Sequence, residues 1–251
     1  CRFLRRREGR RQNSICALMK YKSRAITLRY YKYGESSIIS KLFTEEKGLQ
    51  SFIINGVRSK NSKKNILLFE PFKLVKIDGN FDNKKSLHRL EEINFVENFE
   101  ITKNKMHKNF IAIFCAEVTL KVLQENEKNT SLFDFVWSSI FKLYNKESPA
   151  INFSTNYLLN LSRFLGFYPT ISPSPFFDLE SGEFVREKSF SSNCLDKEMS
   201  YYLFQLLKDE QAKIPREKKS ALLKSILNYF KAHHYNLDNI KSNLVIESLR
   251  L

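Results

Sequence analysis

Hydrophobic and polar positions alternate over residues 24–99, and this pattern predicts β-strands. In the first run, Ile26, Leu28 and Tyr30 alternate with small or polar residues. Turn residues separate the runs, and the polar segment 56–65 predicts a long loop between the third and fourth strands. Five short strands with such a loop predict a small closed or partly open barrel. The expected strands are Arg24–Tyr31, Ser36–Thr44, Leu49–Ile54, Leu67–Asp78 and Leu87–Phe99, the last two parted by a turn at Asp78–Asn80.

The spacing of hydrophobic residues becomes helical beyond residue 99. Thr102, Thr130 and Asp196 are expected to cap helices, because their side-chain oxygens can accept from free backbone amides. Gly166 is expected to end a helix, and residues 170–195, rich in serine and proline, are expected to be irregular. The expected helices are Thr102–Gln124, Thr130–Tyr144, Pro149–Gly166, Asp196–Asp209, one opening at Pro215 and a closing segment Asn243–Leu251.

These patterns predict an α+β, multi-domain protein. A barrel domain is expected over residues 19–99, and a helical domain with an irregular insertion at 170–195 is expected over residues 100–251. Residues 1–18 carry six arginines and no lysine, and the first methionine is Met19. We interpret this basic tail as lying outside the fold, upstream of the natural start or added artificially. The alternative is a basic arm that binds nucleic acid.

Composition narrows the class of protein. The 251 residues are 42% hydrophobic and 14% aromatic, which excludes a disordered chain. The formal net charge of +15 favours a polyanionic partner or an anionic membrane surface. The apolar run Ile111–Ala116 is far shorter than the roughly 20 residues of a membrane-spanning helix.

Motifs for several kinds of chemistry are missing from the sequence. It contains no phosphate-binding glycine loop, no nucleophile elbow and no metal-binding histidine motif. Its four cysteines form no C-x-x-C pair, and Cys115 is expected in the core, so we expect no zinc, no disulfide and a reduced, cytosolic protein. Glu117 stands alone in an apolar helical run. We interpret it as a partly buried carboxylate paired with a lysine or arginine, the alternative being a contact with a partner.

Basic and aromatic residues gather in the barrel segment. Residues 19–97 hold 16 lysines and arginines against nine acidic residues, whereas residues 98–251 hold 20 against 17. Cations for phosphates and aromatic rings for bases are typical of a face that binds single-stranded nucleic acid. The alternatives are a solvated loop and tyrosines packed in the core. The candidate contacts are Arg24, Arg29 and Lys41 on the strands and Arg58, Lys60, Lys63 and Lys64 in the loop.

An ordered series of short motifs resembles the RecO family of recombination mediators. The resemblance covers residues 20–251. Some members of that family carry four zinc-binding cysteines after a Gly-Phe-x-Pro motif, whereas here Thr-Ile-Ser-Pro follows Pro169, so no zinc is implied. The motifs are Tyr33-Gly-Glu-Ser-Ser-Ile-Ile39, Gly56-Val-Arg-Ser-Lys60, Leu68-Phe-Glu-Pro-Phe72, Arg163-Phe-Leu-Gly-Phe-Tyr-Pro169 and Phe177-Asp-Leu-Glu-Ser-Gly-Glu-Phe184.

The resemblance implies an OB-fold barrel followed by a helical domain, and a nucleoid-associated cytoplasmic protein. It implies binding of single- and double-stranded DNA, strand annealing, and loading of recombinase onto strands coated by single-strand-binding protein. The implied partners are RecR and the acidic C-terminal tail of that single-strand-binding protein. A groove for the tail is expected near Arg216, Lys218, Lys219 and Lys224.

No enzyme activity and no cofactor are implied. Two other functions stay open on the residues alone. An OB barrel can also bind RNA, and a nuclease with dispersed carboxylates would show no local motif.

Overall fold

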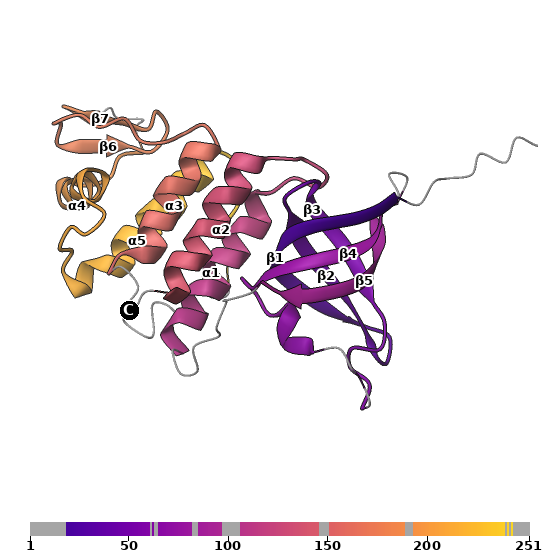
Figure 1. The fold of residues 1–251 in the computed structure, drawn as a ribbon. Helices are drawn as coiled ribbons and strands as arrows, with labels where there is room; N and C mark the ends of the chain where they lie inside the picture. The colour runs from indigo at the N-terminus through magenta and orange to yellow at the C-terminus, as the bar shows by residue number, and fades with distance from the viewer. Residues whose placement is uncertain are drawn as a thin grey trace, which may run out of the picture.

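The computed structural model describes residues 19–60, 62, 65–81, 85–96, 106–145, 151–188, 193–238, 240 and 242. These residues form a β-barrel and a group of helices that lie side by side (Figure 1). The expected α+β class, with the barrel first and the helices after it, is confirmed.

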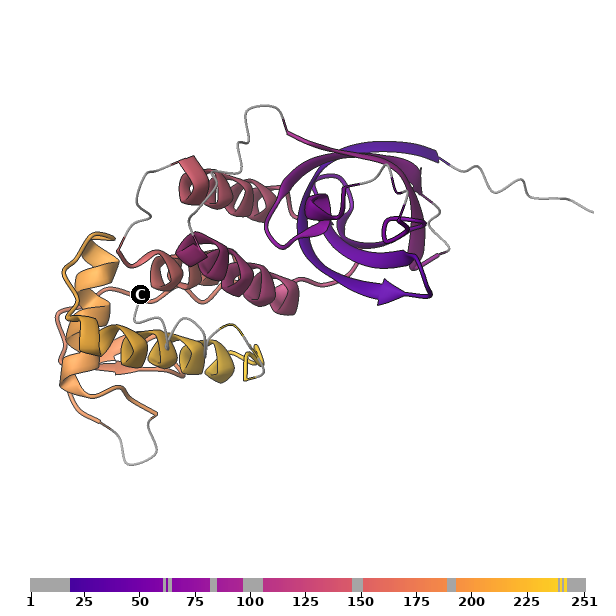
Figure 2. The same ribbon diagram turned by 90° about the horizontal axis from the view of Figure 1, so that it is seen from below.

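Five strands close the barrel in the order β1-β2-β3-β5-β4. Seen along its axis, the sheet forms a complete ring (Figure 2). Neighbouring strands are antiparallel except β3 and β5, which pair in parallel over three residue pairs. The strands are β1 (Met19–Tyr33), β2 (Ser37–Thr44), β3 (Gly48–Ile54), β4 (Leu74–Phe81) and β5 (Leu87–Phe95).

The expected strand at 67–78 is wrong at both ends. Its first residues belong to a 3-10 helix, η1 (Ile66–Phe69), because the Asn65 side chain accepts from the Leu67 amide at 2.9 Å and caps this helix. The expected turn at 78–80 is also wrong, since β4 continues through Gly79 to residue 81. Gly79 serves close packing instead, because a Cβ there would lie 2.9 Å from the Arg89 carbonyl oxygen.

A bulge in β1 determines which residues face the helices. The register with β2 shifts between Thr27 and Arg29, so Leu28 is an extra residue in the strand. Ile26 and Leu28 therefore pack away from the barrel interior, in the same hydrophobic cluster as the helical core. Phe43 of β2 joins this cluster, while the barrel interior forms a separate one.

The rest of the described chain contains five helices and a β-hairpin. The insertion expected to be irregular contains the hairpin, which lies with α4 on the side of the helices away from the barrel (Figure 1). Within the described residues, no helix is long and apolar enough to cross a membrane. The elements are α1 (Met106–Val122), α2 (Thr130–Asn145), α3 (Phe153–Phe164), β6 (Phe176–Asp178), β7 (Glu183–Val185), α4 (Lys197–Lys208) and α5 (Arg216–Ala232).

Of the expected N-terminal helix caps that fall on described residues, one is confirmed and one is wrong. Asp196 caps α4 as predicted, because its Oδ1 accepts from the Met199 amide at 2.8 Å. The predicted cap at Thr130 is wrong, because Asn129 Oδ1 accepts from the Leu132 amide at 2.9 Å instead. The predictions at Thr102, Pro149 and 243–251 lie outside the described residues.

The predicted stop at Gly166 is confirmed. This glycine has φ +87°, and the next amide, that of Phe167, donates to the Ser162 carbonyl at 3.0 Å. Glu117 is partly buried as predicted, but its Oε2 accepts from the amide and hydroxyl of Ser242, at 3.1 and 2.6 Å, rather than from a lysine or arginine. Cys115 is fully buried in the core, as predicted, and burial raises the pKa of its thiol.

Replacing Gly48 with alanine should destabilise the protein. Gly48 has φ +67°, and an added Cβ would lie 2.0 Å from the Glu127 carbonyl oxygen. Left-handed strain and backbone overpacking together should cost roughly 2–5 kcal/mol in the free energy of unfolding, measured by urea denaturation. Gly34→Ala is the control, since Gly34 has φ +55° but no atom within 4 Å of its added Cβ. Equal losses in both variants would contradict the close packing.

Candidate nucleic-acid interface

Arg24 lies at the junction between the barrel and the helices. Its Nε and Nη2 donate to the two carboxylate oxygens of Glu45 at 2.8 and 2.6 Å, and Nη2 also lies 3.3 Å from Asp134 Oδ1 on α2. Its guanidinium carbon sits 4.9 Å from the centroid of the Trp137 ring. The hydrogen bond from Arg24 lowers the pKa of Glu45 and raises that of Arg24 itself. Arg24 therefore contributes to the contact between the barrel and the helices.

Lys41 occupies the edge of the same junction. Its ammonium pairs with Glu125, which lies between α1 and α2. Lys41 is also the Cα partner of Arg29 across β1 and β2. The predicted contacts Arg29 and Lys41 are therefore adjacent, whereas Arg24 is separated from them by the bulge at Leu28.

Beyond the helices, four strands present an exposed surface that we name the outer face. It follows the register of β1, β2, β3 and β5, in which Tyr31 pairs with Ile39, Ile39 with Ile53, and Ile53 with Arg89. Tyr31 is 45% exposed, and the Arg29 guanidinium lies 5.1 Å from its ring centroid. The outer face consists of Arg29, Tyr31, Tyr33, Ile39, Lys41, Ile53 and Arg89.

Two cations of this face are free of acidic partners. Arg29 and Arg89 are exposed, and neither forms a hydrogen bond or ion pair with any residue that the structure describes. Arg89 was missed in the sequence. Strand alternation could have indicated it, because His88 and Leu90 are both buried and Arg89 must then point outward.

The basic loop after β3 is placed in part. Arg58 Nη1 donates to the carbonyls of Gly34 and Ser37, at 3.1 and 3.3 Å, so its side chain ties the loop to the β1–β2 turn beside the outer face. Lys60 is exposed. Lys63 and Lys64 lie outside the described residues.

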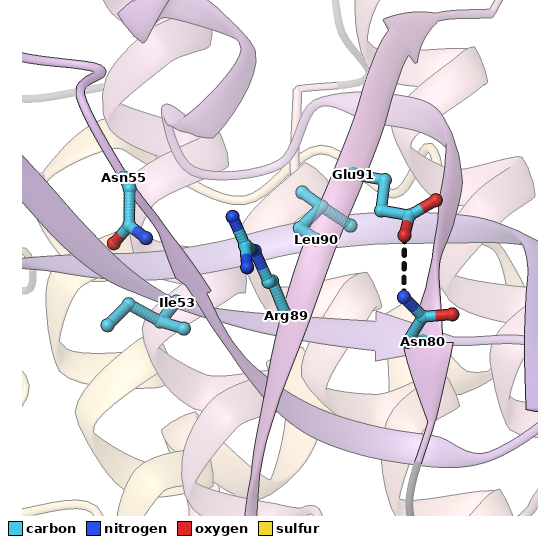
Figure 3. A pocket seen from close by; sticks show the side chains of 6 residues that line it. All are labelled: Ile53, Asn55, Asn80, Arg89, Leu90 and Glu91. Atoms are coloured by element: carbon cyan, nitrogen blue, oxygen red, sulfur yellow. Dashed lines mark hydrogen bonds between the residues drawn. The ribbon is translucent and has the colours of Figure 1, made fainter. Parts of the chain in front are cut away.

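A pocket of about 370 Å³ opens at the β5 end of the outer face (Figure 3). Arg89 and Asn55 point into the space between β3 and β5, and Asn80 and Glu91 form a hydrogen-bonded pair on the other side of β5. Its lining residues are Ile53, Asn55, Asn80, Arg89, Leu90 and Glu91.

Another pocket, of about 430 Å³, lies on a different side of the barrel. It is lined by four carboxylates together with Lys22, Arg24 and Lys76, and two of its charges, Lys22 and Asp78, pair at 3.2 Å. Carboxylates repel phosphates, so this side is poorly suited to DNA. The carboxylates belong to Glu45, Glu46, Asp78 and Glu92.

The basic residues predicted for a partner's tail lie on α5. Lys218 pairs with Glu198 of α4 at 2.6 Å, and the hydrogen bond from this pair raises the pKa of Lys218. Lys219 Nζ donates to the Ile151 carbonyl at 3.4 Å, and partial burial lowers its pKa. Lys224 is exposed, and Arg216 begins the helix.

Family models described as the N-terminal and C-terminal parts of recombination protein O match residues 19–99 and 104–243. The chain belongs to the RecO family. It is 32% identical over 241 residues to the DNA repair protein RecO of Flavobacterium psychrophilum, covering 92% of this chain and 98% of that one. The protein of the same name from Bacteroides fragilis is 27% identical over 240 residues, covering 92% and 99%. The resemblance in the sequence motifs is thereby confirmed. Within the described residues, no group of three or more histidine, cysteine or acidic side chains could hold a metal ion.

Glu45→Gln should lower the free energy of unfolding at pH 7 by at most about 1 kcal/mol, because the Arg24 side chain is 39% exposed and water screens the pair. The folded pKa of Glu45 is lowered, so the ion pair's contribution is present above the unfolded pKa of about 4.3 and is lost as the pH falls through the folded pKa. Urea unfolding at several pH values should show the gap between the two proteins narrowing as the pH falls below the unfolded pKa of about 4.3.

The control is Glu46→Gln, since the pair of Glu46 with Lys128 is half exposed on both sides and should contribute less. A gap between wild type and Glu45→Gln that persists unchanged to pH 3 would show that the carboxylate's charge is not responsible.

Proposed function

We propose that this protein is a non-enzymatic, DNA-binding recombination mediator in DNA repair. It binds single- and double-stranded DNA, anneals complementary strands, and helps to load recombinase onto strands coated by single-strand-binding protein. The supporting observation is the outer face, where free arginines and exposed tyrosines share one surface. Membership of a family whose named members are DNA repair proteins supports the same function.

The mechanism is electrostatic. Arg29 and Arg89 have no acidic partner to leave among the described residues, so they can neutralise phosphates without breaking an existing ion pair. Lys41 would exchange Glu125 for a phosphate, and Lys60, Lys63 and Lys64 would extend the basic surface along the loop. Neutralising the phosphates of two strands lowers their mutual repulsion, which is the requirement for annealing.

The exposed tyrosines give the outer face a second kind of contact. Tyr31 and Tyr33 are 45% and 53% exposed, and stacking of a base on such a ring contributes about 1–3 kcal/mol. Every base has an aromatic face, so stacking of this kind does not depend on sequence. This suits a mediator that must act on any single-stranded gap.

The helical part would recruit the protein partners, RecR and the acidic tail of the single-strand-binding protein. An aspartate-rich tail that ends in phenylalanine would bind best where cations lie beside apolar surface, because the aspartates pair with the cations and the phenylalanine packs on the apolar surface. Lys219 and Lys224 of α5 offer such cations, with Ile151, 60% exposed, beside Lys219. Lys218 would have to exchange Glu198 for the tail.

Arg29→Gln and Arg89→Gln should each weaken binding of a fluorescently labelled single strand. Each loses one phosphate contact, so the slope of log affinity against log salt concentration should shrink by roughly 0.7. Fluorescence titration at several salt concentrations measures both effects. Lys76→Gln is the control, because Lys76 is an exposed lysine beside the acidic pocket. Equal effects from all three changes would overturn the assignment of the outer face.

Lys219→Glu and Lys224→Glu should weaken binding of a labelled aspartate-rich peptide ending in phenylalanine, because the charge reversal repels the peptide. Fluorescence anisotropy measures the affinity. Lys60→Glu, an equal charge change on the barrel, should leave it nearly unchanged. If the α5 variants bind the peptide like the wild type, the tail site lies elsewhere.

A further inference from the structure

The pocket at the end of the outer face is shaped by an irregularity in β5. Asp78 pairs with Glu92 and Gly79 pairs with Leu90, so Glu91 is left as the extra residue of a bulge. Bulges redirect side chains, and this one places the Glu91 carboxylate beside the Asn80 amide. The Asn80 Nδ2 donates to Glu91 Oε1 at 2.5 Å.

This pair leaves two oxygen acceptors at the pocket, Asn80 Oδ1 and Glu91 Oε2, with no hydrogen-bond partner among the described residues. Carboxylate and amide oxygens accept from the amino groups of bases, as when glutamate accepts from cytosine N4. The Ile53 and Arg89 side chains line the same pocket, and Arg89 supplies a cation that has no acidic partner among the described residues. Apolar lining, two acceptors and a cation together match a base and its phosphate.

We propose that this pocket holds one unpaired, amino-bearing nucleobase of a bound single strand. The Asn80–Glu91 pair accepts from the base's exocyclic amino group, while Arg89 holds the neighbouring phosphate. The inference rests on the proposed function, since it assigns a specific contact within the DNA-binding face.

The row of paired residues gives the strand a path to the pocket. Tyr31, Ile39, Ile53 and Arg89 are consecutive partners across four strands, and Asn80 is the partner of Arg89 on β4. A single strand lying along this row has bases free to turn toward the sheet. In a duplex the bases are stacked and their Watson–Crick edges are paired, so a whole base can enter the pocket only from an unpaired strand.

The same chemistry distinguishes the bases. Cytosine carries the N4 amino donor, whereas thymine offers the acceptor O4 at that position. The pocket therefore favours oligo-dC over oligo-dT of equal length and equal charge. The expected ratio of dissociation constants is about five-fold, which is the effect of one net hydrogen bond.

The experiment compares fluorescence titrations of the full chain with 16-nucleotide dC, dT and duplex probes at pH 8, where cytosine is unprotonated. Asn80→Leu and Glu91→Leu should each abolish the dC preference. Glu91→Leu also removes a negative charge beside the DNA, so electrostatics alone would tighten binding of every probe without changing the dC-to-dT ratio. The ratio therefore separates base contact from charge.

Matched controls for both changes lie on β5. Glu92→Leu makes the same change one residue along β5, and Asn94→Leu makes the same change as Asn80→Leu; both residues line the acidic pocket instead. These controls should keep the dC preference. Circular dichroism should show that all four variants are folded.

The outcomes separate the two proposals. Wild-type protein that binds DNA through Arg29 and Arg89 but shows no dC preference, or keeps it in Asn80→Leu and Glu91→Leu, overturns the base pocket and leaves the DNA-binding function standing. Loss of the preference in the controls as well also overturns the pocket. Wild-type protein that binds none of the three probes overturns both proposals.

Discussion

The hydrophobic core shared by barrel and helices is the contact on which the arrangement depends. Four strand residues point away from the barrel interior and pack with the helices: Ile26, Leu28, Phe43 and Leu49. The rings of Phe43 and Phe133 pack edge to face, with 5.3 Å between their centroids. This core covers part of the outward surface of β1, β2 and β3. The rest of that surface carries the exposed tyrosines and Arg29, so the packing of the helices defines where the outer face begins.

The same junction explains why neighbouring cations differ in their availability. Arg24 faces acidic side chains of the β2–β3 turn and of α2, and Lys41 faces Glu125 next to α1. Arg29 lies beyond the helices and meets a tyrosine ring instead of a carboxylate. The count of 42 lysines and arginines therefore overstates the cations that are free to meet DNA, because some of them form ion pairs that stabilise the junction.

The sequence predicted most strands and helices well, but it predicted less well which face of a strand each side chain lies on. Alternation identified β1 as a strand, and strict alternation would place Arg24 and Arg29, five residues apart, on opposite faces. The bulge at Leu28 adds one residue and brings both onto the outward face, and a bulge leaves no mark in the alternation of so short a run. The packing of α2 against Arg24 but not Arg29 then separates the two. The 3-10 helix at 66–69 was missed because its apolar residues also suit a strand, and only the Asn65 cap distinguishes the two.

Arg89 and its pocket differ in how far they could be predicted from the sequence. The outward direction of Arg89 follows from buried His88 and Leu90, so local pattern suffices for that residue. The pocket requires more, because β3 and β5 are joined by a parallel pairing of residues 36 positions apart, Ser51 and Leu87 among them. Closure of the barrel brings Ile53 beside Arg89, and the bulge then adds Glu91. A surface that is assembled by barrel closure and by a bulge leaves no motif in the sequence, because its residues come from separate strands and share no local pattern.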